Sequence, residues 1–323
     1  MNQLTISGSP HVHGELSVKK IMCMVIVALI PAFLVSVYFF GFNAVRVTLI
    51  SVASCVLTEF LIQKYMLKGE NTISDGSAIL TGMLLAFNVP SNIPWWMIVV
   101  GSVVAIGIAK MSFGGLGKNP FNPALVGRVF MLISFPVAMT TWPVPHPLFS
   151  SAVTDAVTGP TTLGLLKEGG AEAVSNINYW DMLVGNTGGS LGEMCAIALI
   201  LGGLFLIIMK IIDWQTPVII IATVALVACI AWLVDPTHYV NPLYHILSGG
   251  LMLGAFFMAT DMVTTPMTTG GKCIFALGVG LITIIIRLWG QYPEGMSFAI
   301  LIMNAAVPLI NKGFKPKRFG VVK

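Results

Sequence analysis

The sequence has few charged residues: Asp, Glu, Lys and Arg make up 9% of its 323 residues, against about 25% in soluble proteins. Seventeen Lys and Arg and thirteen Asp and Glu are too few to cover a water-soluble globule of this length. The chain has no basic patch interleaved with aromatic residues, so nothing in it supports nucleic-acid binding. The low charge therefore excludes an ordinary soluble protein.

Motifs of hydrolases, ATPases and metal sites are also missing. The chain has no Walker loop, GxSxG elbow or zinc signature, and none of its five histidines has an acidic or cysteine neighbour at metal-ligand spacing. The five cysteines form no CxxC pair and lie in or beside apolar runs, which is typical of buried small side chains. The sequence therefore predicts neither a metal centre nor a nucleophilic hydrolase.

Apolar residues make up 56% of the chain and gather in stretches long enough to cross a bilayer as helices. We predict an all-α polytopic membrane protein with about ten transmembrane helices. The first apolar run follows about twenty mostly polar residues and has no small-residue cleavage site after it, so we interpret it as a retained span. The predicted spans cover residues 21–42, 45–66, 76–92, 94–110, 121–140, 191–212, 216–234, 244–260, 273–290 and 295–311.

The basic residues test the orientation of these spans. With the N-terminus in the cytoplasm, thirteen of the seventeen Lys and Arg residues fall on the cytoplasmic side. Arg46, Lys167 and Arg287 fall outside, and Arg128 falls within the fifth span. Because Lys and Arg are enriched in cytoplasmic loops, the distribution predicts that both termini are cytoplasmic.

A connection of about fifty residues between the fifth and sixth spans divides the chain into two groups of five. Because five is odd, the second group enters the membrane from the opposite side, which is the arrangement of an inverted repeat. Residues 82–88 match residues 254–260, and Gly-Lys pairs precede the fifth and ninth spans. The predicted organisation is a cytoplasmic segment at 1–20, membrane repeats at 21–140 and 191–311, an external loop at 141–190 and a basic cytoplasmic tail at 312–323.

Two polar segments interrupt the apolar pattern. In residues 114–127, two Asn-Pro steps break any helix and offer the side chains of Asn119 and Asn122. In a membrane, irregular backbone persists only where it is buried in protein or lines a cavity. A ligand site and a tight re-entrant connection without a ligand are both compatible with this segment.

The second polar segment, residues 259–271, has one carboxylate, Asp261, and five hydroxyl groups. A polar helix cap, a cytoplasmic loop and half of a cofactor or ion site all fit it.

Arg128 and Glu59 are charged residues that lie within the predicted spans. Burying the Arg128 side chain at membrane depth costs at least ~2.5 kcal/mol, so we expect an anionic or dipolar partner unless the side chain reaches the interface. Glu59, near the cytoplasmic end of the second span, is the nearest acidic candidate for an ion path, although passage at a boundary with other subunits is the stronger expectation.

Several strings together resemble a known family, that of the D subunit of the Rnf electron-transport complex, whose relative is the B subunit of the sodium-pumping NADH:quinone reductase. The matching strings run in order from about residue 9 to residue 320. They are Ser9-Pro-His11, the segment Gly114 to Ala124, Asp155 to Thr161, Gly192-Glu193, Gly254-Ala-Phe-Phe-Met-Ala-Thr-Asp261, Arg287 and Tyr292-Pro-Glu-Gly295.

The resemblance implies a membrane component of an ion-translocating ferredoxin:NAD oxidoreductase that carries covalent FMN on a threonine. The family motif is Asp-x-x-(Ser/Thr)-Gly-Ala-Thr, which a flavin transferase modifies. Mapped onto this chain, Asp155 opens the motif, Thr158 and Gly159 follow, and Thr161 is the acceptor. Proline replaces the usual alanine at position 160, and Thr162 adds a second hydroxyl beside the acceptor. We prefer Thr161 because it keeps the family spacing from Asp155.

The resemblance also implies a second, non-covalent flavin, riboflavin, for which Asn119, Asn122 and Asp261 are the candidates. The implied partners are the other Rnf subunits, the flavin transferase and the lipid bilayer of a bacterial or archaeal cytoplasmic membrane. The isolated subunit is expected to be inactive. A solute channel or secondary transporter with inverted repeats is the alternative function, and a scaffold that only anchors other subunits fits the helix-breaking segments less well.

Overall fold

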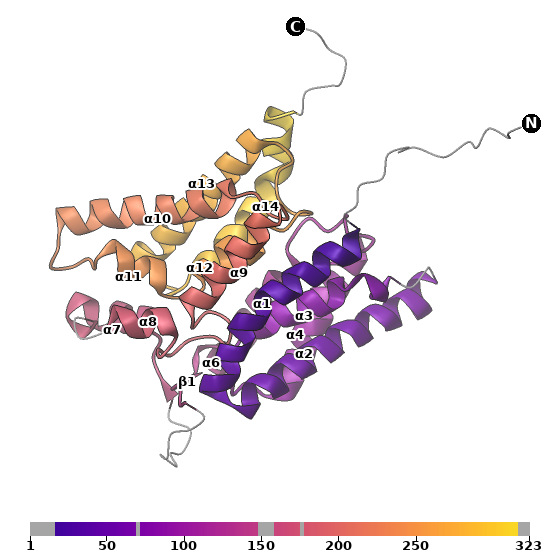
Figure 1. Ribbon diagram of the computed structural model, residues 1–323, viewed down its shortest axis with the longest axis horizontal. Coiled ribbons are helices and arrows are strands. Elements are labelled where there is room, and N and C mark those ends of the chain that lie inside the picture. The colour runs from indigo at the N-terminus through magenta and orange to yellow at the C-terminus, as the bar shows by residue number, and fades with distance from the viewer. Residues whose placement is uncertain (1–16, 69–71, 148–157, 175–177, 316–323) are drawn as a thin grey trace, which may run out of the picture.

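The computed structural model describes residues 17–68, 72–147, 158–174 and 178–315. The described chain is mostly helical, with one short antiparallel strand pair. In Figure 1 the first helices, in indigo and purple, form one group, and the later helices, in orange and yellow, form a second group beside it. The elements α7 and α8 of the intervening loop lie next to α11 of the second group.

The first group begins with its own two longest helices and continues with shorter, interrupted ones. Ser17 caps α1 by accepting a hydrogen bond from the Lys20 amide at 3.2 Å, and Gly41, at φ +59°, separates α1 from α2. The bounds are α1 Val18–Phe40, α2 Phe42–Leu61, the π-helical turn η1 Ile62–Leu67, η2 Ile73–Asp75, α3 Ser77–Phe87, α4 Trp95–Val103, the π-helical turn η3 Val104–Ile108, η4 Met111–Phe113, α5 Pro123–Ser134 and α6 Pro136–Thr140.

The connection between the groups has secondary structure of its own, including the only strands in the described residues. The strands β1 Trp142–Pro143 and β2 Thr158–Gly159 pair antiparallel. Two helices follow, α7 Thr162–Ala173 and α8 Tyr179–Val184. The expectation of an all-α protein is therefore correct for the bulk of the chain, with this small pair as the exception.

The second group contains α9 Ala196–Ile208, α10 Gln215–Val234, α11 Pro242–Leu247, α12 Leu251–Leu253, the π-helical turn η5 Gly254–Met258, α13 Thr269–Trp289 and α14 Met296–Gly313. The predicted span 244–260 is thus divided into three elements. The division falls at residues 248–250, where Gly249 adopts φ +65°, a conformation that favours glycine.

Six helical segments of the described chain are long and apolar enough to cross a membrane. They are Val18–Phe40, Phe42–Leu67, Trp95–Phe113, Gln215–Val234, Thr269–Trp289 and Met296–Gly313. Three shorter apolar helices, Ser77–Phe87, Pro123–Ser134 and Ala196–Ile208, fall below the usual spanning length of about 20 residues. The structure therefore supports a multi-pass membrane protein, with several of the predicted spans shortened or broken.

The two helical groups pack directly against each other. The first helix, α1, packs on α9, the first of the second group, and α5 packs on α14. At the α1–α9 contact a Cβ on Gly202 would overlap the carbonyl oxygen of Ala28. Only glycine fits there, so the two backbones approach closely where the groups meet.

Candidate functional site

A pocket lies where the start of α1 meets the two polar segments that interrupt the membrane helices. Its lining includes Asn119, Asn122 and Asp261, the three side chains selected for a non-covalent ligand. The empty space in this pocket, including the open solvent at its mouth, is about 810 Å³. Apolar side chains from both helical groups make up most of the wall. The structure thus brings all three predicted residues into one pocket.

Asn122 has a structural task in this pocket. Its Oδ1 accepts hydrogen bonds from the amides of Ala124 at 3.1 Å and Leu125 at 3.4 Å, which caps α5. Pro123 occupies the first helical position, where its missing amide hydrogen costs nothing. The Nδ2 of Asn122 donates to the Met258 carbonyl at 3.3 Å, which links the two groups. The second Asn-Pro step therefore starts a helix, and both polar atoms of Asn122 already have partners.

Asn119 is the side chain best placed to contact a ligand. Its Nδ2 donates to the Phe121 carbonyl at 3.1 Å, whereas its Oδ1 is buried without a hydrogen-bond partner. A buried amide oxygen left unpaired costs about 1–3 kcal/mol. A ligand that presents an N–H or O–H group to this oxygen would remove that cost.

Asp261 lies three residues after the end of η5 and accepts hydrogen bonds from its own loop. Its Oδ1 accepts from the Val263 amide at 3.4 Å, and its Oδ2 accepts from the Thr264 hydroxyl at 3.0 Å. Burial raises the pKa of the Asp261 carboxyl, and these two hydrogen bonds oppose the rise. The segment after η5 is therefore a polar turn whose carboxylate borders the pocket.

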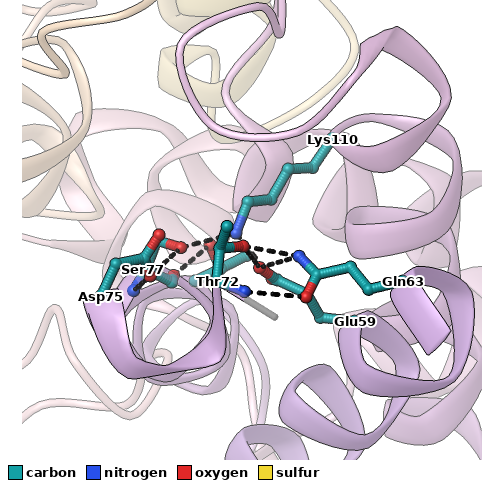
Figure 2. A network of polar contacts seen from close by, with 7 residues as sticks. Glu59, Gln63, Thr72, Asp75, Ser77 and Lys110 are labelled. Atoms are coloured by element: carbon teal, nitrogen blue, oxygen red, sulfur yellow. Dashed lines mark hydrogen bonds and ion pairs between the residues drawn. The ribbon is translucent and has the colours of Figure 1, made fainter. Parts of the chain in front are cut away.

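A buried ion pair borders the pocket on the side of the first group (Figure 2). Lys110, which lines the pocket, donates from Nζ to Glu59 Oε2 at 2.6 Å and to Ser77 Oγ at 2.7 Å. Ser77 Oγ in turn donates to Asp75 Oδ1 at 2.6 Å. The Lys110 and Glu59 side chains are 2% and 0% exposed.

The second carboxylate oxygen of Glu59, Oε1, is contacted by Gln63 and Thr72. Gln63 Nε2 and Thr72 Oγ1 each lie 3.4 Å from Glu59 Oε1, and Gln63 Oε1 accepts from the Thr72 amide at 3.0 Å. The charge of Glu59 is therefore balanced by Lys110, which the charge distribution counted among the cytoplasmic basic residues.

The predicted flavin-attachment segment joins the strand pair to α7. Thr158 and Gly159 form β2, and Asp155 lies outside the described residues. Thr161 caps α7, because its Oγ1 accepts from the Gly164 amide at 3.0 Å. The residue is 9% exposed. The predicted acceptor hydroxyl therefore sits at a helix N-terminus, a position that favours a phosphate group.

Contacts with the second group hold this segment in place. The Tyr244 hydroxyl donates to the Thr162 carbonyl at 2.6 Å. Lys167 donates to the carbonyls of Ile286, Gly290 and Tyr292, at the C-terminal end of α13. Burial lowers the pKa of the Lys167 ammonium below its ordinary value. The predicted external loop is therefore docked onto the membrane helices.

Arg128 pairs with an acidic side chain, as expected for an arginine within a predicted membrane span. Its Nη2 pairs with Glu294 Oε2, and its Nη1 donates to Asn88 Oδ1 at 3.2 Å and to Ser297 Oγ. Arg128 comes from the first group and Glu294 from the second, so the pair joins the two groups. The sequence predicted an anionic or dipolar partner for Arg128 but did not indicate which residue it is.

Two further charged residues near this pair were missed as site residues. Arg287 is 4% exposed and donates to the carbonyls of His245 and Ser248. Glu193 is 6% exposed and accepts from the Ser190 amide at 3.0 Å. The strings that carried the family resemblance contain Arg287, Glu193 and Glu294, which was the available signal.

Comparison with known proteins finds similarity over nearly the whole chain. The model of the NQR2, RnfD, RnfE family matches residues 5–320. The chain is 48% identical to the D subunit of the proton-translocating ferredoxin:NAD(+) oxidoreductase complex of Clostridium ljungdahlii, covering 99% of this chain and 97% of that protein. It is also 48% identical to the D subunit of the Na(+)-translocating ferredoxin:NAD(+) oxidoreductase complex of Acetobacterium woodii, covering 100% and 98%. The D subunit of an ion-translocating oxidoreductase complex of Escherichia coli is 37% identical over 98% of each chain.

Proposed function

Because this chain belongs to the NQR2, RnfD, RnfE family, we propose that it is a membrane subunit of an ion-translocating ferredoxin:NAD oxidoreductase. The observation that carries the proposal is 48% identity over nearly the full length of relatives that bear this function in their names. One of those relatives is named for protons and the other for sodium, and the proposal covers both ions. The chain acts with the other subunits of the complex and is inactive alone.

We further propose that Thr161 carries FMN through a phosphoester. The support is the position of its hydroxyl at the N-terminus of α7, where amide groups and the helix dipole favour a phosphate. Thr162 has the weaker position, because it lies inside the first turn with its carbonyl bound by Tyr244. A flavin transferase attaches the group, and Asp155, Thr158 and Gly159 belong to the motif it acts on. FMN, once bound, supplies the one- and two-electron chemistry of the relay.

The pocket is the proposed site of a non-covalent flavin, riboflavin. Asn119 Oδ1 offers an acceptor that lacks a protein donor, and the apolar wall suits a flat aromatic ring. Asn122 shapes the pocket by capping α5, and Asp261 borders the ring edge with its hydroxyl-rich turn. These residues orient and bind the cofactor, while proton and electron chemistry remain with the flavin.

The finer architecture that we propose is ten membrane segments in two inverted five-helix repeats, residues 21–140 and 191–311. The packing of α1 on α9 supports it, since each is the first helix of its repeat, and α5 and α14 add a second contact between the repeats. The third segment is the short α3 and the eighth is the broken set α11, α12 and η5. Discontinuous helices at equivalent places are a common feature of such repeats.

The termini are proposed to be cytoplasmic, in the cytoplasmic membrane of a bacterium or archaeon. Ile21 and Met22, at the start of α1, line the same pocket as Asp261. The turn after Asp261 contacts the end of α14, where Met267 N donates to Asn311 Oδ1 at 3.3 Å. The two ends of the helical region therefore lie on one side, as an even number of spans requires.

The test of the attachment is the intact mass and in-gel flavin fluorescence of protein co-expressed with a flavin transferase. We expect a gain of one FMN less one water in the wild type and in Thr162→Ala, and no gain in Thr161→Ala. A gain that persists in Thr161→Ala moves the attachment to Thr162 or Thr158. No gain in any protein, with a transferase active on another substrate, contradicts the flavoprotein function.

A secondary transporter is the second candidate, which the broken helices α11 and α12 favour. It predicts solute flux through the reconstituted protein, unchanged in Thr161→Ala. Absence of flux together with covalent flavin would leave the electron-transfer function in place.

A further inference from the structure

Five buried polar atoms without a hydrogen-bond partner gather around the break between α11 and α12. Within the described residues six buried side-chain atoms lack a partner, and only Asn119 Oδ1 lies elsewhere. Buried polar groups are rarely left unpaired, so their concentration at one place points to a bound species. The five atoms are Ser190 Oγ, Glu193 Oε2, His245 Nδ1, Ser248 Oγ and Arg287 Nε.

At the same place two carboxyl groups meet. Oxygens of Glu193 and Glu294 both lie within 4 Å of the position that a Cβ on Gly250 would occupy. The Gly250 amide donates to Glu294 Oε1 at 3.0 Å, and a Cβ on Gly250 would lie 3.1 Å from Glu193 Oε2. Two ionised carboxylates repel each other, and neither can donate a hydrogen bond, so a proton on one of them would relieve the repulsion and supply a donor.

The remaining contacts indicate which oxygen holds the proton. Both oxygens of Glu294 already accept, Oε2 from Arg128 and Oε1 from Gly250, which favours the ionised form of Glu294. Glu193 accepts only at Oε1, from the Ser190 amide, and no protein group donates to its Oε2. An O–H bond at Glu193 Oε2 supplies the donor that the pair lacks.

We propose that Glu193 is a proton-binding residue whose Oε2 holds a proton shared with Glu294, which makes the break between α11 and α12 a proton site between the two helical groups. The site is separate from the Glu59–Lys110 pair and from the pocket. It rests on the side chains of this chain alone and does not depend on a bound flavin.

Two buried guanidinium groups lie beside the two acids of the site. Arg128, from α5, pairs with Glu294, and Arg287, from α13, binds the carbonyls of His245 and Ser248. The two guanidinium groups favour ionised acids and disfavour a metal cation beside them. A proton satisfies the carboxyl contact without the several oxygen ligands that a metal ion needs.

The other titratable groups at this place come from α11 and α7. Tyr244 and His245 are buried on α11, and the Tyr244 hydroxyl is bound to Thr162. Lys167, on α7, directs its ammonium to the end of α13. Neither the Tyr244 hydroxyl nor the Lys167 ammonium donates to Glu193 in these contacts, which leaves Glu294 as the acceptor of its proton.

The first test is infrared spectroscopy of the full-length chain in lipid, in H₂O and D₂O at neutral pH. We expect the C=O stretch of a protonated carboxylic acid, shifted in D₂O, to be present in the wild type and in the exposed-loop control Glu168→Gln. It should be lost in Glu193→Gln. An unchanged band in Glu193→Gln overturns the proposal, and so does loss of the wild-type band on adding sodium at constant pH.

The second test compares thermal stability, because the proposal makes the two acids unequal. A glutamine at position 193 reproduces the protonated acid, accepting from Ser190 and donating to Glu294, so Glu193→Gln should unfold at the wild-type temperature. Glu294→Gln removes the anion that pairs with Arg128 and should unfold at a clearly lower temperature. Equal losses in the two variants overturn the assignment of the proton to Glu193.

Discussion

Replacing Lys110 with methionine should destabilise the protein strongly, because it leaves the Glu59 carboxylate buried without a cation. The two side chains are 2% and 0% exposed, and Nζ lies 2.6 Å from Oε2. After the change Glu59 retains only the contacts of Gln63 and Thr72, both at 3.4 Å. Removing one partner of a buried ion pair costs about 3–5 kcal/mol. This corresponds to a fall of about two to three and a half powers of ten in the folding equilibrium.

The matched control removes both charges at once. Methionine keeps the length of Lys110 and glutamine keeps the shape of Glu59, so the double variant Glu59→Gln/Lys110→Met leaves no buried ion. We expect the double variant to be more stable than Lys110→Met alone, with a coupling energy at the upper end of the ~0.5–3 kcal/mol seen for contacting residues.

Reversible unfolding in mixed micelles, followed by tryptophan fluorescence, measures all four proteins of the cycle. The reasoning is refuted if the double variant loses the sum of the two single losses. Additivity would mean that Glu59 and Lys110 are stabilised independently of each other.

Four further results are expected. Because Lys110 neutralises Glu59, a complex carrying the double variant should still pump ions, and loss of pumping at full stability would place Glu59 on the ion path. Lys167→Met removes three hydrogen bonds from an ammonium group, each worth about 1.5–3 kcal/mol when well formed. Limited proteolysis of residues 158–174 should therefore become faster in this variant. An unchanged rate would contradict the docking of this segment onto the membrane helices. Asn119→Ala should weaken flavin retention without loss of stability, whereas Asn122→Ala should also lose about 1 kcal/mol of stability with the helix cap; equal effects in chromatography and thermal unfolding would argue against these separate roles. Burial raises the pKa of Asp261, so the folded state binds more protons there and the unfolding temperature should fall as pH rises above the ordinary carboxyl pKa of about 4; the fall should be smaller in Asp261→Asn.

Local chemistry made much of the pocket predictable from sequence. Asn-Pro steps and a hydroxyl-rich turn beside Asp261 break helices wherever they occur, and broken helices inside a membrane must line a cavity or lie against protein. The sequence therefore located Asn119, Asn122 and Asp261, although it assigned Asn122 to a ligand when its side chain is used as a helix cap.

The long-range pairs were not predictable in the same way. Glu59 and Lys110 are 51 positions apart, and Arg128 and Glu294 are 166 apart. A single sequence carries no signal that joins such residues, so Lys110 was counted only among the cytoplasmic basic residues and Glu294 only as part of a motif. Helix lengths were also overestimated, because Pro136 and the Ser248–Gly250 break divide apolar runs that look continuous by composition alone.

The docking of the segment around Thr161 sets an order of events in the assembly of the protein. Thr161 is 9% exposed and its hydroxyl oxygen is bound to Gly164, so the proposed attachment requires the modifying enzyme to act before α7 packs against α11 and α13. The proposed covalent modification would therefore compete in time with the completion of folding. A cell that makes this chain faster than it supplies the modifying enzyme would accumulate fully folded protein that can no longer be charged with cofactor.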